Sequence, residues 1–127
     1  MHLHTRFTQA FGLTTPIALA PMALASGGAL SAACAQAGAL GLLGGGYGEL
    51  DWTLREHRLA LQTLSGQPEA LARLGCGFIT WRLDKDASAL DALLGLPVLV
   101  LVWLAGRAQR GGDGNPPKAP NNTPLPF

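Results

Sequence analysis

The longest uncharged segment of the chain limits what it can fold into. Between Arg6 and Glu49 the sequence holds no acidic or basic residue, and alanine, glycine and leucine dominate it. Such a segment belongs either in the buried core of a domain or in a targeting peptide. The choice between these two decides which class of protein the chain belongs to.

The targeting interpretation draws on the N-terminal third of the chain. Residues 1–37 contain a basic residue, Arg6, then an apolar run over 16–25 and small residues around Cys34 where a signal peptide could be cleaved. Two prolines, Pro16 and Pro21, interrupt that apolar run. We therefore favour the core interpretation and keep a secreted small protein as an alternative.

Hydrophobic periodicity predicts alternating strands and helices. Continuously apolar runs are typical of strands buried on both faces, and i, i+3, i+4 spacing is typical of helices. After one helical turn holding Phe7 and Phe11, the expected elements are strand 16–20, helix 29–37, strand 39–43, a helix from Glu49 that Gly66 ends, helix 69–73, strand 74–80, polar loop 81–86, helix 88–94 and strand 98–103. This alternation with short connections predicts an α/β fold with parallel strands.

The same spacing predicts which helix faces are buried. Ser26 is the expected N-cap of the helix over 29–37. Its buried face is expected to hold Leu30, Ala33, Cys34 and Ala37, and that of the next helix Leu50, Leu54, Leu61 and Leu64. His57 lies beside Glu56 and Arg58, so we expect it to be exposed.

Composition narrows the possible partners. A formal charge of +1 gives no reason to expect nucleic acid. The apolar run over 93–105 is shorter than the roughly 20 residues that span a membrane, so we expect no membrane partner. Cys34 and Cys76 show no paired spacing, which favours free buried thiols and hence a reducing, cytoplasmic setting.

Few residues suggest a site on local evidence. The glycines over 44–48 follow an expected strand and precede a helix, where backbone N–H groups can bind phosphate, but they do not fit the dinucleotide or P-loop patterns. The segment 81–86 holds charges and an aromatic residue at the end of a strand, or is simply a solvated loop. His2 and His4 lack a third ligand, so no metal site is expected. No catalytic residue can be assigned.

Several short motifs resemble those of the nitronate monooxygenase (2-nitropropane dioxygenase) family. The segment 5–12, with Thr-Arg-Phe-Thr and Phe-Gly, is similar to the start of that family, as is Ala-Pro-Met-Ala at 20–23. Ala-Gly-Ala-Leu-Gly-Leu-Leu-Gly at 37–44 and Gly-Cys-Gly-Phe at 75–78 extend the resemblance, which covers roughly residues 5–94.

The resemblance implies a fold, a cofactor and an activity. Members of this family are FMN-dependent (β/α)₈ TIM barrels that oxidise alkyl nitronates with O₂. Ala20, Pro21 and Met22 would then lie beside the flavin ring. Gly77 stands where the family usually carries an asparagine that contacts FMN, so at this position only the backbone could approach the cofactor.

The length of the chain sets a further expectation. Eight β/α units need roughly 250 residues, so 127 residues have room for the first three or four. Residues 1–94 are expected to form the N-terminal part of the FMN-binding barrel, and residues 95–127 an apolar segment and a disordered Pro/Gly-rich tail outside the family pattern. We expect impaired or lost activity and self-association through exposed sheet edges. Alternatives are an FMN-dependent enoyl-acyl carrier reductase or a non-catalytic fragment.

Overall fold

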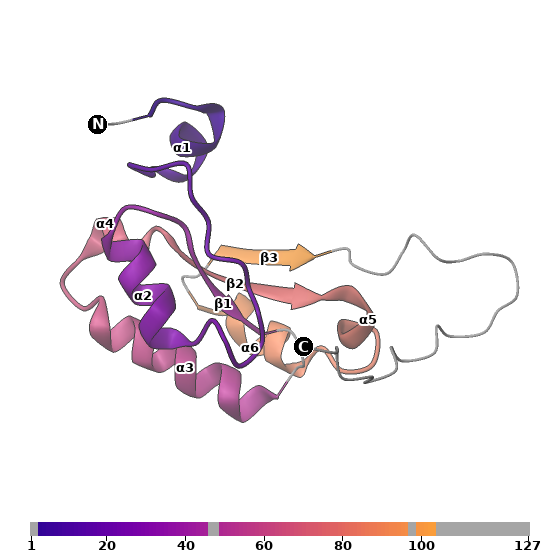
Figure 1. Ribbon diagram of the computed structural model, residues 1–127. Helices are drawn as coiled ribbons and strands as arrows, with labels where there is room; N and C mark the ends of the chain where they lie inside the picture. The colour runs from indigo at the N-terminus through magenta and orange to yellow at the C-terminus, as the bar shows by residue number, and fades with distance from the viewer. Residues whose placement is uncertain (1–2, 46–48, 97–98, 104–127) are drawn as a thin grey trace, which may run out of the picture.

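The computed structural model describes residues 3–45, 49–96 and 99–103. In chain order its elements are α1 (Arg6–Phe11), α2 (Gly28–Gln36), β1 (Gly41–Gly44), α3 (Leu50–Thr63), α4 (Pro68–Leu71), β2 (Leu74–Ile79), α5 (Thr80–Leu83), α6 (Ser88–Leu94) and β3 (Leu99–Trp103). Figure 1 shows the strands side by side, with α2, α3 and α6 packed along them.

The strands form a parallel sheet in the order β1-β2-β3. Gly41 pairs with Leu74, and Gly75 with Leu99. Helices connect each strand to the next, as parallel pairing requires. The predicted mixed α/β class with parallel strands is confirmed.

Helices α2, α3 and α6 pack on one face of the sheet, whereas α1 packs against Leu42 on the other face of β1. Side chains alternate between the two faces of a strand, and Leu43, Cys76 and Phe78 share one cluster with Ala89 and Leu93 of α6. On β2 the residues of the other parity are Gly75, Gly77 and Ile79, which belong to the opposite face. The two glycines carry no side chain there and are both buried, whereas Ile79 is half-buried.

Small residues let α2 and α3 approach each other closely. The cluster between these helices and β2 consists of Ala32, Ala35, Ala60, Leu64, Ala70 and Leu74. At Gly28, an added Cβ would overlap the Glu56 carbonyl oxygen and lie 3.1 Å from the Ala60 nitrogen. The alanine and glycine content of the uncharged segment is thus used for close helix packing, as the core interpretation requires.

The N-terminal helix α1 is locally stabilised. The Thr5 hydroxyl accepts a hydrogen bond from the Thr8 N–H at 3.1 Å, and the Thr8 hydroxyl accepts one from the Thr5 N–H at 2.8 Å, which forms a capping box. Phe7 and Phe11 meet edge to face at 5.3 Å. Both rings pack against a cluster of Leu13, Leu40 and Leu42, so the predicted helical turn at Phe7 and Phe11 is confirmed.

The first predicted strand is wrong in extent and in burial. Within residues 16–20, a single parallel bridge joins Ala18 to Leu40, and Ile17 is 60% exposed. In the described structure only β1 borders this segment, so one edge and much of its apolar surface face solvent. An apolar run in a sequence indicates residues that favour burial, but it does not show which other segment packs against them.

The predicted buried face of α2 is also wrong. Leu30, Ala33 and Ala37 are exposed and Cys34 is half-buried, whereas the buried residues are Gly28, Ser31, Ala32 and Ala35. In a helix made almost entirely of small residues, hydropathy differs little from face to face, so close backbone approach decides which side is buried. The N-cap is Gly27 and not Ser26.

Two predictions in the second half need correction. His57 is 2% exposed, buried with Thr53 and Ala60 of α3, while the predicted Leu50, Leu54 and Leu61 are only half-buried beside them. Helix α2 packs closely on the side of α3 that holds Thr53, His57 and Ala60. The three leucines therefore lie beside this contact and not in it. The predicted loop 81–86 begins with the short helix α5.

We expect the stability of the fold to fall as the pH drops below 6.5. Burial lowers the pKa of His57 from its ordinary value of 6.5, and its Nε2 atom has no hydrogen-bond partner among the described residues. Between the lowered folded value and 6.5 the unfolded chain binds more protons, so stability decreases as pH falls through that window. Urea unfolding at pH 8 and pH 5.5 should show a lower midpoint at pH 5.5.

The control is His57→Leu, which removes the titrating group. It should flatten the change in urea midpoint between the two pH values, because His57 is the buried histidine of the described part of the chain. An unchanged pH dependence in this variant would assign the effect to other groups.

Candidate functional site

A tight turn over residues 22–26 lies at the carboxyl end of β1. The buried Ser26 hydroxyl donates to the Met22 carbonyl at 2.9 Å and accepts from the Met22 N–H at 2.7 Å. The Gly44 N–H donates to the Ser26 carbonyl at 2.9 Å, which fastens the turn to the strand. Ser26 therefore stabilises this turn instead of capping α2.

The structure brings two of the predicted cofactor residues to one place. A Cβ at Gly44 would overlap the backbone of Met22, so the turn lies directly on the strand at this point. Gly44 pairs with Gly77 across the sheet, and the Gly45 N–H donates to the Gly77 carbonyl at 2.9 Å. Met22 and Gly77 are thus both neighbours of the end of β1, although 55 positions separate them in the sequence.

The predicted cofactor residues differ in exposure. Ala20 is exposed, Pro21 is half-buried and Met22 is 54% exposed, whereas Gly77 is buried. The Met22 N–H also donates to the Ala20 carbonyl at 2.9 Å, which keeps Ala20 within the same turn region. These residues offer apolar surface and backbone at the strand ends, and no ionisable group.

A small cleft opens on the helix side of the turn. Its volume is about 130 Å³, and it is lined by Ala23, Leu24, Gly44, Gly45, Glu49, Trp52 and Thr53. Pockets that enclose a whole cofactor usually measure about 300–1,000 Å³. The cleft can therefore take only part of such a ligand.

Leu24 is a feature of this cleft that sequence reasoning missed. Its φ of 65° lies in the left-handed region, which is unfavourable for a leucine, and its side chain is 75% exposed. Backbone strain and an exposed large apolar side chain at one position are typical of functional sites. A leucine between two alanines gives no such signal in the sequence, because only the turn reveals its φ angle.

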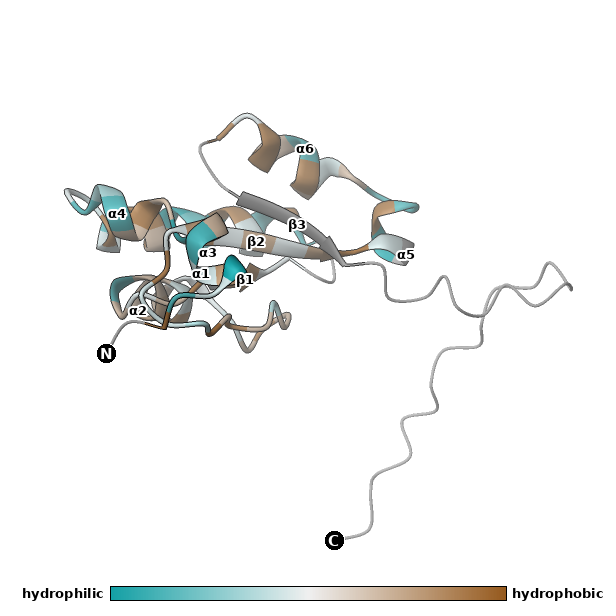
Figure 2. Cartoon of the chain, turned by 90° about the horizontal axis from the view of Figure 1, so that it is seen from above, coloured by the Kyte–Doolittle hydropathy of each residue, from teal (hydrophilic) through white to brown (hydrophobic). Residues whose placement is uncertain are grey.

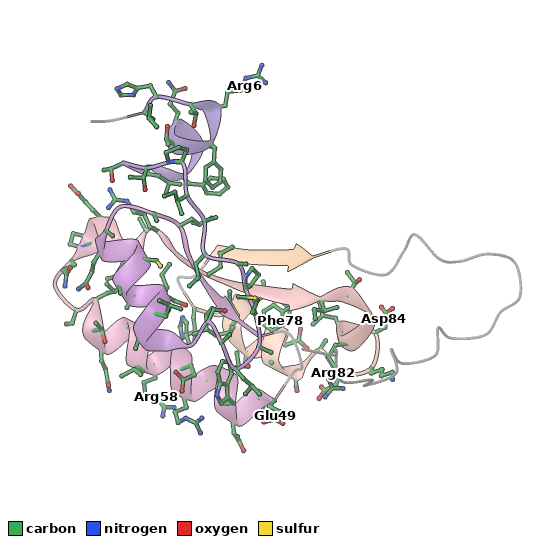
Figure 3. All side chains as sticks on the ribbon, in the orientation of Figure 1. Arg6, Glu49, Arg58, Phe78, Arg82 and Asp84 are labelled. Atoms are coloured by element: carbon green, nitrogen blue, oxygen red, sulfur yellow. The ribbon has the colours of Figure 1, made fainter. Side chains whose placement is uncertain are left out.

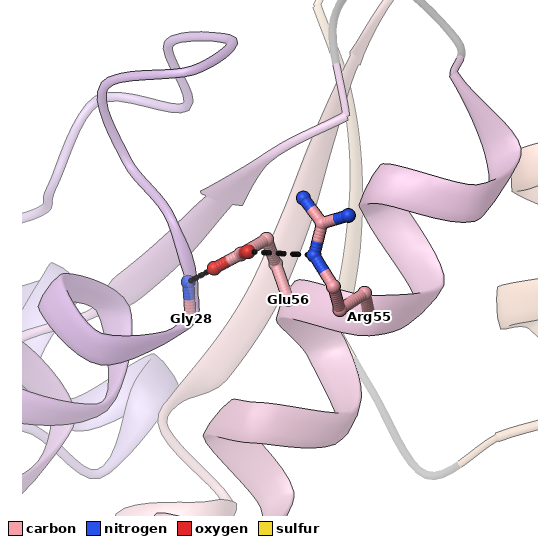
Figure 4. A network of polar contacts seen from close by, with 3 residues as sticks. All are labelled: Gly28, Arg55 and Glu56. Carbon is pink, nitrogen blue, oxygen red and sulfur yellow. Dashed lines mark hydrogen bonds and ion pairs between the residues drawn. The ribbon is translucent and has the colours of Figure 1, made fainter.

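The N-terminus of α2 already has an anionic partner. The Glu56 carboxylate of α3 accepts the Gly28 N–H at 2.9 Å and also contacts Arg55 at 3.4 Å (Figure 4). A helix N-terminus attracts negative charge, and here a side chain of the protein supplies it. α3 in turn begins beside Glu49 and Asp51, which disfavours a phosphate at its N-terminus. Gly46 and Gly48 of the predicted glycine-rich segment lie outside the described residues.

The second candidate segment, 81–86, forms local contacts. Arg82 pairs with Asp86 at 3.7 Å, and the Asp86 carboxylate accepts a hydrogen bond from the Ser88 N–H at 3.0 Å. The hydrogen bond from Ser88 and, to a smaller extent, the charge of Arg82 lower the pKa of Asp86 from its ordinary value. Figure 3 shows Arg82 and Asp84 at α5, whereas Phe78 lies on β2 among the packed elements. The plain interpretation of this segment, charges that offset one another at the surface, fits these contacts.

The buried Cys76 offers no nucleophile in the described structure. Both cysteines are free, as predicted, but Cys34 is half-buried and only Cys76 is fully buried. Burial raises the pKa of the Cys76 thiol to about 12. Because the thiolate is the reactive form, Cys76 is a packing residue between the sheet and α6.

Comparison with models of protein families, with curated proteins and with solved structures finds no match to this chain. Among the described residues, no helix has the length and apolar character needed to cross a membrane.

Proposed function

We propose that this chain contains the residues that bind the flavin ring in an FMN-dependent oxidoreductase of the nitronate monooxygenase type. Enzymes of this type act on alkyl nitronates with O₂. One observation supports the proposal most strongly. Met22 lies against Gly44, and Gly44 pairs with Gly77, at the carboxyl ends of adjacent parallel strands. Parallel α/β folds bind their ligands at this end of the sheet.

The surface chemistry at this point suits a flat, largely apolar ring. Gly75 and Gly77 are buried and carry no side chain on the face of β2 opposite α3 and α6. A ring that reaches this face meets backbone at these two positions. Met22 offers an exposed, adaptable thioether beside it. Ala20 and Pro21 extend this apolar surface along the turn.

The described residues fit the ring of FMN and not its phosphate. The α2 N-terminus is occupied by Glu56, and α3 starts with acidic residues. We therefore assign to these residues the orientation of the ring and the exclusion of water from one side of it. FMN, when bound, supplies the redox chemistry.

We assign no catalytic base to this chain. Among the described residues, His4 is exposed near the N-terminus, and His57 is a buried residue of α3. Neither lies in the turn or in the cleft at the strand ends. The proposal therefore concerns cofactor binding and orientation.

The arrangement of helices supports the finer fold assignment. In a (β/α)₈ barrel the helices form an outer ring and the opposite sheet face forms the barrel interior. Helices α2, α3 and α6 pack on a single face here, whereas Phe7 and Phe11 of α1 pack with Leu42 on the other face of β1. We propose that the described residues correspond to the first units of such a barrel.

An FMN titration followed by flavin fluorescence tests the proposal. Met22→Asp places a charge where the ring is expected and should weaken binding at least tenfold, or about 1.4 kcal/mol. The matched control is Leu59→Asp, since Leu59 is a similarly exposed apolar residue on α3, at 41%. Equal affinity in the two variants, with helical content retained in both, would refute a role for Met22 in flavin binding.

A further inference from the structure

The sheet has an unused edge at residues 17–19. The Leu19 N–H donates to the Leu40 carbonyl at 2.9 Å, and the Leu40 N–H donates to the Ile17 carbonyl at 3.0 Å. In a parallel ladder the residue between these two, Ala18, directs its own N–H and C=O away from β1. Within the described residues, neither group has a hydrogen-bond partner.

The side chains at this edge favour pairing over solvation. Ile17 exposes most of its surface, and no charged residue lies between Arg6 and Glu49 to oppose the approach of another strand. Natural sheet edges are commonly protected by lysines, bulges or covering loops. In Figure 2 the segment between α1 and α2 lies at the margin of the molecule and is hydrophobic in part.

The opposite edge of the sheet is β3. The order from one edge to the other is 17–19, β1, β2, β3, and every neighbouring pair is parallel. Within the described part of the chain, no strand pairs with the outer side of β3. Since all four segments run in one direction, the 17–19 edge of one copy matches the β3 edge of a second copy.

We propose that two copies of this chain associate head to tail through these edges. Residues 17–19 of each copy pair in parallel with β3 of the other, and the two contacts close a ring. Four parallel segments from each copy give eight, the number at which parallel α/β barrels close. Helices α2, α3 and α6, which share one face of each sheet, would lie outside. Contacts between unlike edges form closed rings when the rotation closes. This proposal does not depend on flavin binding.

The mass of the chain in solution tests the proposal. Light scattering after gel filtration should give twice the 13.2 kDa chain mass. Ile17→Lys should shift the mass to that of one chain, whereas Leu59→Lys, on the helix layer, should leave the pair intact. Ala18→Pro should also dissociate the pair, because it removes the outward N–H and spares both hydrogen bonds to Leu40.

Hydrogen exchange identifies the contact surface. In the pair the Ala18 amide should exchange slowly, and in the monomeric variants it should exchange rapidly. Circular dichroism establishes that each variant is folded, and if one edge variant does not fold, the other decides the outcome. A monomeric wild-type chain, open polymers without a fixed size, or a pair that survives the edge substitutions would each overturn the proposal.

Discussion

Gly41→Ala is expected to destabilise the fold by about 3 kcal/mol, because a methyl group has no space at this position. The added Cβ would overlap the carbonyl oxygen of Ser31 and lie 3.3 Å from the Ala35 nitrogen. Both neighbours are backbone atoms of α2, so the helix as a whole must move away from β1. Domains of this size are usually stable by only about 5–15 kcal/mol, so the loss is a large fraction of the total.

Urea unfolding followed by circular dichroism measures this effect. The matched control is Gly95→Ala, since no atom lies within 4 Å of the Cβ position there. The control should change the free energy of unfolding by less than about 0.5 kcal/mol, as surface substitutions usually do. If Gly41→Ala were as mild as its control, α2 would not pack on β1 as described.

Phe78→Ala is expected to cost about 3–5 kcal/mol, the range for removing a buried aromatic side chain. The ring is 2% exposed and packs in the cluster with Leu43, Cys76, Ala89 and Leu93. It also lies beside Gly45, where an added Cβ would be 2.6 Å from the Phe78 Cε1 atom. The substitution therefore removes a contact that joins β2, α6 and the end of β1.

The control for this prediction is Leu94→Ala on the same helix layer. Leu94 is 62% exposed, so its truncation removes little buried area and should be nearly neutral. Thermal or urea unfolding of both variants separates the two outcomes. A small effect of Phe78→Ala would show that the cluster between the sheet and α6 does not stabilise the fold.

The order of elements could be predicted from the sequence, but the burial of the first ones could not. Strands 39–43, 74–80 and 98–103 were expected close to where β1, β2 and β3 lie, because each is a short apolar run bounded by glycine or polar residues. In α2 nearly all side chains are small, so their hydropathy does not show which face of the helix is buried. The small residues of α2 also explain the burial of His57. At Gly28 the backbone of α2 approaches Glu56 and Ala60 of α3 closely, which covers the side of α3 that holds His57.

The candidate site was predictable only in part. The turn at 20–22 and Gly77 were singled out through a family resemblance, and the structure places Met22 and Gly77 on either side of Gly44. The roles of Ser26 and Leu24 depend on the hydrogen bonds and φ angles of a single turn. No periodicity or motif encodes these, so the structure was needed to find them.

The absorbance spectrum of the purified chain tests the flavin assignment most directly. After incubation with FMN and removal of free cofactor by gel filtration, the account predicts a flavin band in the blue region that elutes with the protein. A folded chain that elutes colourless would contradict flavin binding by these residues. Bleaching of the bound flavin by a reduced nicotinamide, without air, would assign the chain to the enoyl reductase type instead.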